Sequence, residues 1–420
     1  MDGFEKYYRK SWSKRLEILE KTNKLTPKQV ELLKTSTNNP QLGETMIENF
    51  ITHYSLPEGL ALNLVVNQQE YVVPMVTEEP SVIAAASHGA GIVKRAGGFI
   101  AEVKNRLMLG QVVCENVTDA TSLQIYVKEN EATLLEIANK AHLSIVKRGG
   151  GARFLRSRIL ASDLVSIDLA VDVKEAMGAN MLNTMLEALA TKIQNDCQQD
   201  ILMSILSNYA NECLVTTTCQ IPVDLLAKNG IAGIKIAQKI AQASRLAKLD
   251  VYRAATHNKG IMNGIDAAVL ASGNDWRAIE AGAHAYASRD GQYKGLSTWQ
   301  LEDNNLVGTL TLPLPLGSVG GSISIVPLVE VNRTLLENPN AIKLEQIIAS
   351  LGLAQNLAAL YALVTEGIQK GHMHLQLKSL AVAIGAKDYE VNEVVKKLQA
   401  KGLRDSKSAK EILTTLRQNN

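Results

Sequence analysis

The chain has few cysteines and almost no net charge. Its 420 residues include only four cysteines, Cys114, Cys197, Cys213 and Cys219, which lie far apart and form no Cys-x-x-Cys pair. This spacing argues against a disulfide scaffold and a zinc site, and it favours reduced thiols in a cytoplasmic protein. Lysine and arginine number 44 against 42 acidic residues, and the formal charge of +2 argues against a nucleic-acid-binding protein.

Targeting and membrane segments are also lacking. The first 25 residues mix charged and apolar side chains, without the apolar core of a signal peptide. Residues 347–364 form an uncharged run of membrane-spanning length, but Ser350, Gln355 and Asn356 interrupt it. Such an alanine-rich segment is more typical of a helix in a large α-rich core or a subunit interface. We therefore expect no membrane partner.

A Rossmann fingerprint is missing as well. The nearest sequence, Gly-Ala-Gly-Ile-Val-Lys at 89–94, has Lys94 where the third glycine should be and lies in a helical pattern. A nicotinamide cofactor would therefore bind outside a Rossmann fold. At 420 residues the chain is long enough for two or three domains, and its hydrophobic content of 46% is ample for a sizeable core.

Local patterns predict a mixed α and β chain. The N-terminal 48 residues have a helical period, with a start at Thr26-Pro27 and a break at residues 38–40. A strand-like stretch at 61–76 leads to Glu79, which is held extended by Pro80 before a helix whose first turn contains that proline. Further predictions are strands at 109–117 and 153–173 and helices at 130–141 and 176–206.

The most informative segment is His-Asn-Lys-Gly-Ile-Met-Asn-Gly-Ile-Asp at 257–266, followed by Gly-Asn-Asp-Trp-Arg at 273–277. A lysine partly removed from water, with its charge fixed by a carboxylate, can stabilise a developing oxyanion. Lys259 and Asp275 are candidates for these two roles. Taken alone, the residues favour a simpler interpretation, in which Lys259 is a solvated loop lysine and Asp275 caps a helix that begins at Trp276.

Five segments together resemble the class II, bacterial and soluble, hydroxymethylglutaryl-CoA reductases. They are Met-Ile-Glu-Asn at 46–49, Val-Pro-Met-Val-Thr-Glu-Glu-Pro-Ser at 73–81, Asp-Val-Lys-Glu-Ala-Met-Gly-Ala-Asn at 172–180, the lysine and aspartate segments, and Gly-His-Met at 371–373. They occur in the family's order with similar spacing. The resemblance implies interconversion of (S)-3-hydroxy-3-methylglutaryl-CoA with mevalonate and CoA by two hydride transfers from NAD(P)H.

The resemblance also implies an α+β architecture. A large α-rich catalytic domain would comprise residues 1–109 and 216–370. A small α+β domain, ferredoxin-like and non-Rossmann, would be inserted at 110–215 and bind the cofactor. Residues 371–420 would form a C-terminal helical flap. The family is dimeric, with active sites shared between subunits, so a homodimer or a dimer-based oligomer is implied, although Phe-Ile-Thr-His at 50–53 departs from the small residues usual at its interface.

The resemblance assigns catalytic roles to four residues. Lys259 would stabilise the oxyanion of the thioester and then of the hemithioacetal, and Asp275 would hold that lysine. Glu79 would supply a proton to the carbonyl oxygen, a role favoured by burial, whereas its neighbour Glu78 would face away. His372, near the Gly367 and Gly371 of a mobile flap, would protonate the CoA thiolate. By spacing alone, His374 is as good a candidate as His372.

Cofactor residues are expected in two places. Glu175, Met177, Gly178 and Asn180 match the family's cofactor motif, and a glycine at a helix start lets backbone amides approach a pyrophosphate, although a plain helix start fits as well. His142 stands where NAD-using relatives have an aspartate, near Lys140, Lys147 and Arg148, so NADPH is favoured and NADH remains possible. Alternatively, His142 is a plain surface residue. Asn208 matches a position in the cofactor cleft.

Substrate contacts are implied for Ser81, Arg253 and Asn263. Arg253 would pair with the substrate carboxylate in bidentate fashion. Each residue also has a structural interpretation, since Ser81 could cap a helix, Arg253 could lie on a surface loop and Asn263 could make a turn. A non-redox CoA-thioester enzyme and a silent CoA-binding scaffold are the alternative functions, and no metal site is expected.

Overall fold

The computed structural model describes residues 4–367 and 377–418, and two compact units divide the chain after Pro57. The predicted α+β class is confirmed. Residues 4–57 belong to the first of these units, and the predicted bounds of the large domain, 1–109 and 216–370, stay a prediction. The N-terminal unit is helical and contains a 3-10 turn at Tyr7–Arg9 and helices α1 (Trp12–Lys21), α2 (Pro27–Thr35) and α3 (Pro40–Met46).

Caps fix the helices of this unit where the sequence predicted them. Thr26 and Gln29 form a capping box at the start of α2, and Pro27 occupies its first position. The side chain of Asn39 accepts a hydrogen bond from the backbone of Leu42 and starts α3. Arg15, almost fully buried, donates to the backbone oxygen of Phe50 and ties the last part of the unit to α1.

The large domain is built from a β-hairpin, a four-stranded antiparallel sheet and several helices. The hairpin pairs β1 (Glu58–Val66) with β2 (Gln69–Val76), and the second sheet has the order β3-β8-β10-β9. The strands of that sheet are β3 (Ile100–Val103), β8 (Leu214–Pro222), β9 (Ser297–Glu302) and β10 (Asn305–Pro313). The helices are α4 (Val82–Lys94), α9 (Gly233–Leu249), α10 (Val251–Ala271), α11 (Trp276–Ala287), α12 (Pro327–Leu335) and α13 (Ala341–Val364). Short 3-10 turns lie at Val223–Leu226 and Gly321–Ser324.

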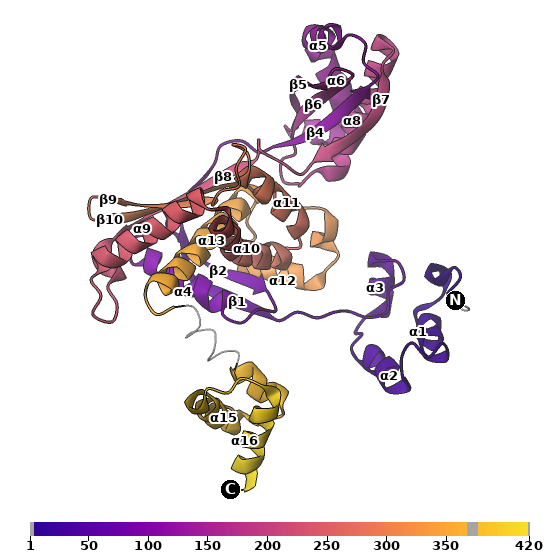
Figure 1. Cartoon of the computed structure of the whole chain (residues 1–420). Coiled ribbons are helices and arrows are strands. Elements are labelled where there is room, and N and C mark those ends of the chain that lie inside the picture. Colours follow the sequence, from indigo (N-terminus) through magenta and orange to yellow (C-terminus); the bar gives the residue numbers. More distant parts are fainter. Residues whose placement is uncertain (1–3, 368–376, 419–420) are drawn as a thin grey trace. The chain divides into compact units, whose positions relative to one another are not determined.

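Helix α13 runs through the core beside α4 and α10 (Figure 1). A Cβ on Gly89 of α4 would lie 2.0 Å from the backbone oxygen of Ala354, so only glycine allows this close approach. Helix α13 is the one described helix that is long and apolar enough to cross a membrane, yet 78% of its most apolar window is buried inside the protein. Burial on all sides explains its uniformly apolar composition, as expected for a core helix.

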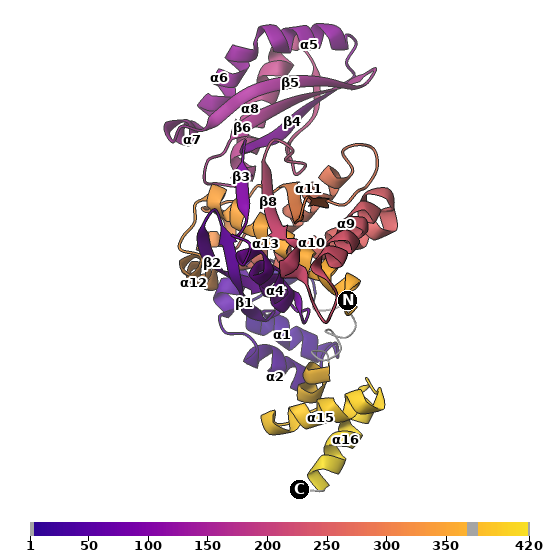
Figure 2. The same cartoon turned by 90° about the vertical axis from the view of Figure 1, so that its left-hand side faces the viewer.

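The small domain has the ferredoxin-like arrangement that was predicted. Its sheet has the order β5-β6-β4-β7, and every pair is antiparallel. Its strands are β4 (Leu107–Glu115), β5 (Gly151–Ala161), β6 (Leu164–Asp172) and β7 (Asp200–Ser207). Its helices are α5 (Ala120–Glu129), α6 (Glu131–Ala141), α7 (Leu143–Lys147) and α8 (Ala179–Cys197), and α5, α6 and α8 pack on the sheet (Figure 2).

Two local predictions were wrong. The single helix predicted at 176–206 is α8 followed by strand β7, because the apolar run at 200–207 completes the sheet beside β4. The first turn predicted to contain Pro80 lies outside α4, which begins at Val82. Residues 377–383, α15 (Asp388–Lys401) and α16 (Ser406–Gln418) are helical and share a small core of their own. The boundaries predicted for the inserted domain and the flap stay a prediction.

Candidate active site

A cavity of about 490 Å³ lies among α4, α10 and α13 in the large domain. Five residues predicted from the sequence line it, namely Glu79, Ser81, Arg253, Lys259 and Asn263. Alanines of α4 and α13 form much of its apolar wall. The lining therefore combines charged and hydrogen-bonding groups with apolar side chains, as binding sites for small organic molecules commonly do.

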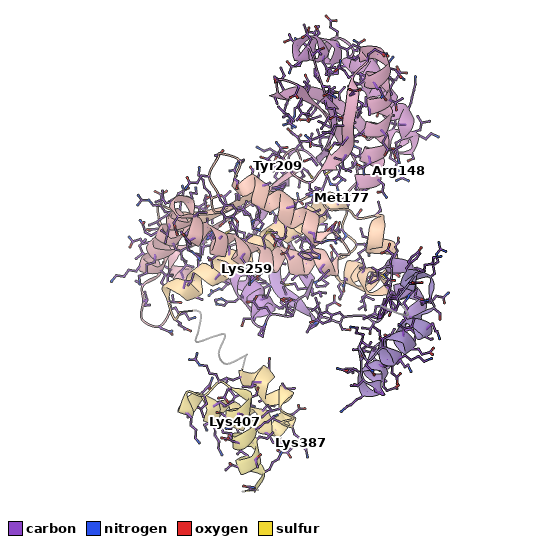
Figure 3. All side chains as sticks on the ribbon, turned by 45° about the vertical axis from the view of Figure 1, so that its right-hand side comes forward. Arg148, Met177, Tyr209, Lys259, Lys387 and Lys407 are labelled. Carbon is purple, nitrogen blue, oxygen red and sulfur yellow. The ribbon has the colours of Figure 1, made fainter. Side chains whose placement is uncertain are left out.

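Lys259 lies in the middle of α10, not on a loop, and Figure 3 shows it in the large domain. Its Nζ atom is 2.7 Å from Oε2 of Glu79, which stands between the end of β2 and the start of α4. Both side chains face solvent, with 61% of Lys259 and 35% of Glu79 exposed. The expected withdrawal of these groups from water is therefore wrong for one chain alone. Glu78 is exposed and does not line the cavity.

Asp275 does not hold Lys259 within one chain. Its Oδ1 accepts hydrogen bonds from the backbone of Arg277 and Ala278, at 3.1 and 3.3 Å, and caps α11. It also pairs with the Arg277 guanidinium at 3.2 Å. Between Lys259 and Ala271, α10 continues for 12 residues, which is roughly 18 Å of helix. In a single chain, Glu79 is the carboxylate that pairs with the lysine.

Arg253 and Ser81 offer unpaired polar atoms to the cavity. Arg253 lies in the first turn of α10, and no described residue accepts a hydrogen bond from its guanidinium. Burial lowers the pKa of this arginine. Ser81 has a positive φ of 80°, its side chain caps no helix, and its buried Oγ has no partner among the described residues. The structural interpretations of both residues are therefore wrong, and the two groups are suited to an anionic oxygen ligand.

Gln355 of α13 is a further cavity residue, which the sequence reasoning did not assign to the site. It is 96% buried, with 4% exposure, and its Oε1 atom has no hydrogen-bond partner among the described residues. Gly264 of α10 makes room for it, since a Cβ there would lie 3.1 Å from the Gln355 Cβ. The available signal was a polar residue interrupting an apolar run. A buried amide without a partner indicates a ligand-binding role.

The cofactor motif lies at the start of α8 in the small domain. Gly178 is the N-cap residue with φ of 89°, and a Cβ there would lie 2.4 Å from Cγ1 of Val173. No side chain caps this helix, so its first backbone amides are free to meet an anion. Asn180 is exposed in the first turn, whereas Met177 is partly buried against the small-domain core (Figure 3).

Glu175 is already engaged in the protein. Its carboxylate accepts hydrogen bonds from Oγ of Ser318 at 2.5 Å and from the backbone of Ala341 at 2.8 Å. Burial raises the pKa of Glu175, but these hydrogen bonds and the nearby Arg106 outweigh it and leave the pKa lowered. The residue expected to contact the cofactor therefore ties the motif to the start of α13.

Known proteins resemble this chain over nearly its whole length. The profile of the family described as hydroxymethylglutaryl-coenzyme A reductase matches residues 11–377. The 3-hydroxy-3-methylglutaryl-coenzyme A reductase of Archaeoglobus fulgidus is 37% identical over 98% of this chain and 94% of its own length. The chain belongs to the hydroxymethylglutaryl-coenzyme A reductase family.

Solved structures of this reductase family agree with the fold. The enzyme from Streptococcus pneumoniae superposes with a TM-score of 0.77 at 49% identity, over 98% of this chain and 99% of that one. A class II reductase structure from the same organism, bound to NADPH in open conformations, gives the same TM-score at 50% identity over 97% of this chain and 100% of that one. The resemblance to class II reductases is thereby confirmed.

The residues expected to set the preference between NADPH and NADH lie on the small domain. His142 is partly exposed between α6 and α7, and its Nδ1 lies 3.2 Å from Oγ of Ser144. Lys140 pairs with Glu136 at 2.6 Å, whereas Lys147 and Arg148 are exposed. Figure 3 labels Arg148 on the small domain.

Three remaining expectations concern Asn208, the flap histidine and metals. Asn208 is exposed just after β7. His372 and His374 lie outside the described residues. Within 4–367 and 377–418, no group of acidic, cysteine or histidine side chains is arranged to hold a metal ion.

Proposed function

We propose that the chain catalyses the NADPH-dependent reduction of (S)-3-hydroxy-3-methylglutaryl-CoA to mevalonate and CoA, and the reverse reaction, with NADH as a possible second cofactor. The observation that carries this proposal is the 2.7 Å pair of Lys259 and Glu79 at the mouth of a cavity that also holds an unpaired Arg253. Membership of the reductase family supports it. A non-redox enzyme or a silent scaffold is not favoured, because Lys259, Glu79 and Asp275 are all retained.

The residues of the cavity divide the chemistry among them. Lys259 stabilises negative charge on the carbonyl oxygen of the thioester and of the hemithioacetal, because its ammonium group is fixed before the reaction begins. Glu79, at hydrogen-bond distance from Lys259, delivers a proton to that oxygen. His372 protonates the departing CoA thiolate. These roles are proposals that the resemblance to the family supports.

Arg253, Ser81, Asn263 and Gln355 hold the acid end of the substrate. The Arg253 guanidinium pairs with the terminal carboxylate, and charge-assisted hydrogen bonds of this kind are stronger than neutral ones. The buried Ser81 Oγ and Gln355 Oε1 have no partner among the described residues. A carboxylate of the substrate can accept from the Ser81 hydroxyl, and a substrate hydroxyl can donate to Gln355 Oε1, at no loss of internal bonds.

The residues at the start of α8 fit a dinucleotide. Gly178 leaves the first amides of the helix accessible, and these amides with the positive end of the helix bind the pyrophosphate. The bound cofactor supplies the hydride. His142 in place of an acidic residue, with the exposed Arg148 nearby in sequence, leaves the 2′-phosphate of NADPH unrepelled.

We infer a homodimer with shared active sites. Within one chain Asp275 is engaged by Arg277 and Ala278, whereas Lys259 pairs with Glu79, and the side chains of Asp275 and Lys259 are both exposed. The Asp275 of a second subunit can therefore hold Lys259 where its own Asp275 cannot. That subunit would also cover the open mouth and withdraw the lysine from water. We also propose a cytoplasmic location, since all four cysteines are free thiols.

The direct test is the oxidation of NADPH and, separately, NADH at 340 nm with hydroxymethylglutaryl-CoA. We expect substrate-dependent oxidation, faster with NADPH, that Lys259→Ala abolishes. Lys239→Ala, which removes an exposed lysine outside the cavity, is the matched control and should retain full activity. No oxidation by the unaltered protein, in either direction and with either cofactor, would rule the function out.

A further inference from the structure

A buried ion pair lies where the chain passes between its two larger domains. Nε of Arg106 is 2.8 Å from Oε1 of Glu345, and the two side chains are only 9% and 1% exposed. Arg106 directly precedes β4, the first strand of the small domain, whereas Glu345 lies in the first turns of α13. Burying two charges costs free energy, so this pair needs further hydrogen bonds to be maintained, and among the described residues only Nη1 of Arg106 lacks one.

The Arg106 guanidinium also holds the cofactor motif. Its Nη2 atom donates to the backbone oxygen of Ala176, at 3.1 Å, and to the backbone oxygen of Leu316. Ala176 is two residues before Gly178, the N-cap of α8. A single side chain therefore connects the start of the dinucleotide-binding helix to α13.

Glu345 also contacts two further chain segments at this junction. Its Oε1 atom accepts a hydrogen bond from the backbone of Leu316 at 3.4 Å and from Sγ of Cys213 at 3.8 Å. Cys213 directly precedes β8, where the chain returns to the large domain. Nearby, a Cβ on Gly317 would lie 2.9 Å from the backbone nitrogen of Met177, so this loop and the cofactor motif are in close contact.

Helix α13 links this junction to the catalytic cavity. Glu345 is near its start, and Gln355, ten residues further along, lines the cavity. Ten residues of helix span roughly 15 Å. Because α13 is buried almost throughout, its two ends move as one body, and the position of Ala176 is set relative to the cavity wall.

We propose that Arg106 and Glu345 are positioning residues that fix the dinucleotide-binding segment, residues 176–178, against the body that carries Lys259. This inference rests on the proposed function and adds residues that do not touch substrate or cofactor. Hydride transfer needs donor and acceptor in close register, so loosening this connection weakens productive cofactor binding more than substrate binding.

The test compares Arg106→Gln, Arg106→Lys and Glu345→Gln with the unaltered enzyme. We expect Arg106→Gln to raise the Kd for NADPH, measured by its fluorescence without substrate, and the KM for NADPH by about tenfold. The KM for hydroxymethylglutaryl-CoA should stay unchanged. Arg106→Lys should lie between, because an ammonium group can pair with Glu345 but lacks the planar fork that reaches both Glu345 and Ala176.

Arg158→Gln is the matched control. Arg158 pairs with Asp168, a carboxylate 2% exposed, at 2.6 Å within the small domain. Arg158→Gln should lower the melting temperature of the enzyme without raising its Kd for NADPH.

An unchanged Kd and KM for NADPH in folded Arg106→Gln would overturn the proposal, as would an equal rise in Arg158→Gln. Should Arg106→Gln not fold, Glu345→Gln decides by the same criterion, since it keeps the shape and the acceptor oxygen. Failure of the proposed function is distinct, because the unaltered protein would then show neither NADPH binding nor oxidation.

Discussion

The cavity and the domain junction each contain a cation paired with a glutamate, and the structure treats the two pairs in opposite ways. Lys259 and Glu79 are 61% and 35% exposed, beside polar groups without partners. Arg106 and Glu345 are 9% and 1% exposed, and they bind each other and the backbone of Ala176 and Leu316, while Nη1 of Arg106 has no partner among the described residues. The cavity therefore leaves polar atoms on two neighbouring side chains, Ser81 and Gln355, open to a ligand, whereas the junction pair is held by several hydrogen bonds inside the protein.

The largest effect should come from the exposed pair. Lys259→Ala should lower kcat by about a thousandfold, because it removes the charge that stabilises the oxyanion. The melting temperature should barely change, since the exposed pair contributes little to stability. Steady-state kinetics and a thermal melt check both statements. A large loss of stability would show that Lys259 is structural and would break the comparison.

Arg253→Ala should act on substrate binding. Loss of a charge-assisted contact to the carboxylate should raise the KM for hydroxymethylglutaryl-CoA by about 10- to 100-fold. The KM for NADPH should stay unchanged, which is the reverse of the pattern expected for Arg106. Arg245→Ala, an exposed arginine of α9, is the control. Equal changes in both KM values would contradict a role at the acid end of the substrate.

Gly178→Ala should act at the cofactor motif. The positive φ and the close Val173 side chain make a Cβ costly there, so the affinity for NADPH should fall by about tenfold. Gly230→Ala has a similar φ of 79° with open space around it and serves as the control for backbone strain. Both variants should lose stability, and only the first should lose NADPH affinity in a fluorescence titration. Unaltered affinity in Gly178→Ala would exclude this helix start as the pyrophosphate site.

The smallest effect concerns His257, which lies on α10 close to Lys259 but faces the core. Burial, with a smaller effect of Arg253, lowers the pKa of His257 to about 3. A histidine with a lowered pKa contributes stability above its usual pKa of 6.5, and this stability is lost as pH falls from about 6.5 towards 3. His257→Gln should make the melting temperature less dependent on pH in that window. An unchanged dependence of the melting temperature on pH would show that other groups control the loss of stability in acid.

Sequence patterns identified residues of the cavity better than they predicted the secondary structure that holds these residues. Glu79, at a strand-to-helix junction marked by Pro80, could be located from local rules. Lys259 was expected in a turn-rich region, but Asn258, Gly260 and Asn263 all lie inside α10. Packing against α13 overrides their weak helix propensity, and this packing is not visible in local sequence.

Gln355 and Arg106 could not be assigned from the sequence for a related reason. Helix α13 is apolar on every side, so its periodicity does not tell which polar residue faces the cavity. Arg106 and Glu345 are 239 residues apart, and only the assembled junction brings them together. The role proposed for Asp275 requires contacts beyond one chain, which neither pattern nor spacing encodes.

Subunit complementation tests the central claim that a second copy completes the open site. Lys259→Ala and Asp275→Ala should each be inactive as homodimers. If Lys259 of one subunit works with Asp275 of the other, half of the dimers in an equal random mixture contain one intact site. The mixture should then show about a quarter of the unaltered activity. Activity no higher than that of either parent, with mixed dimers verified by mass, would contradict the claim.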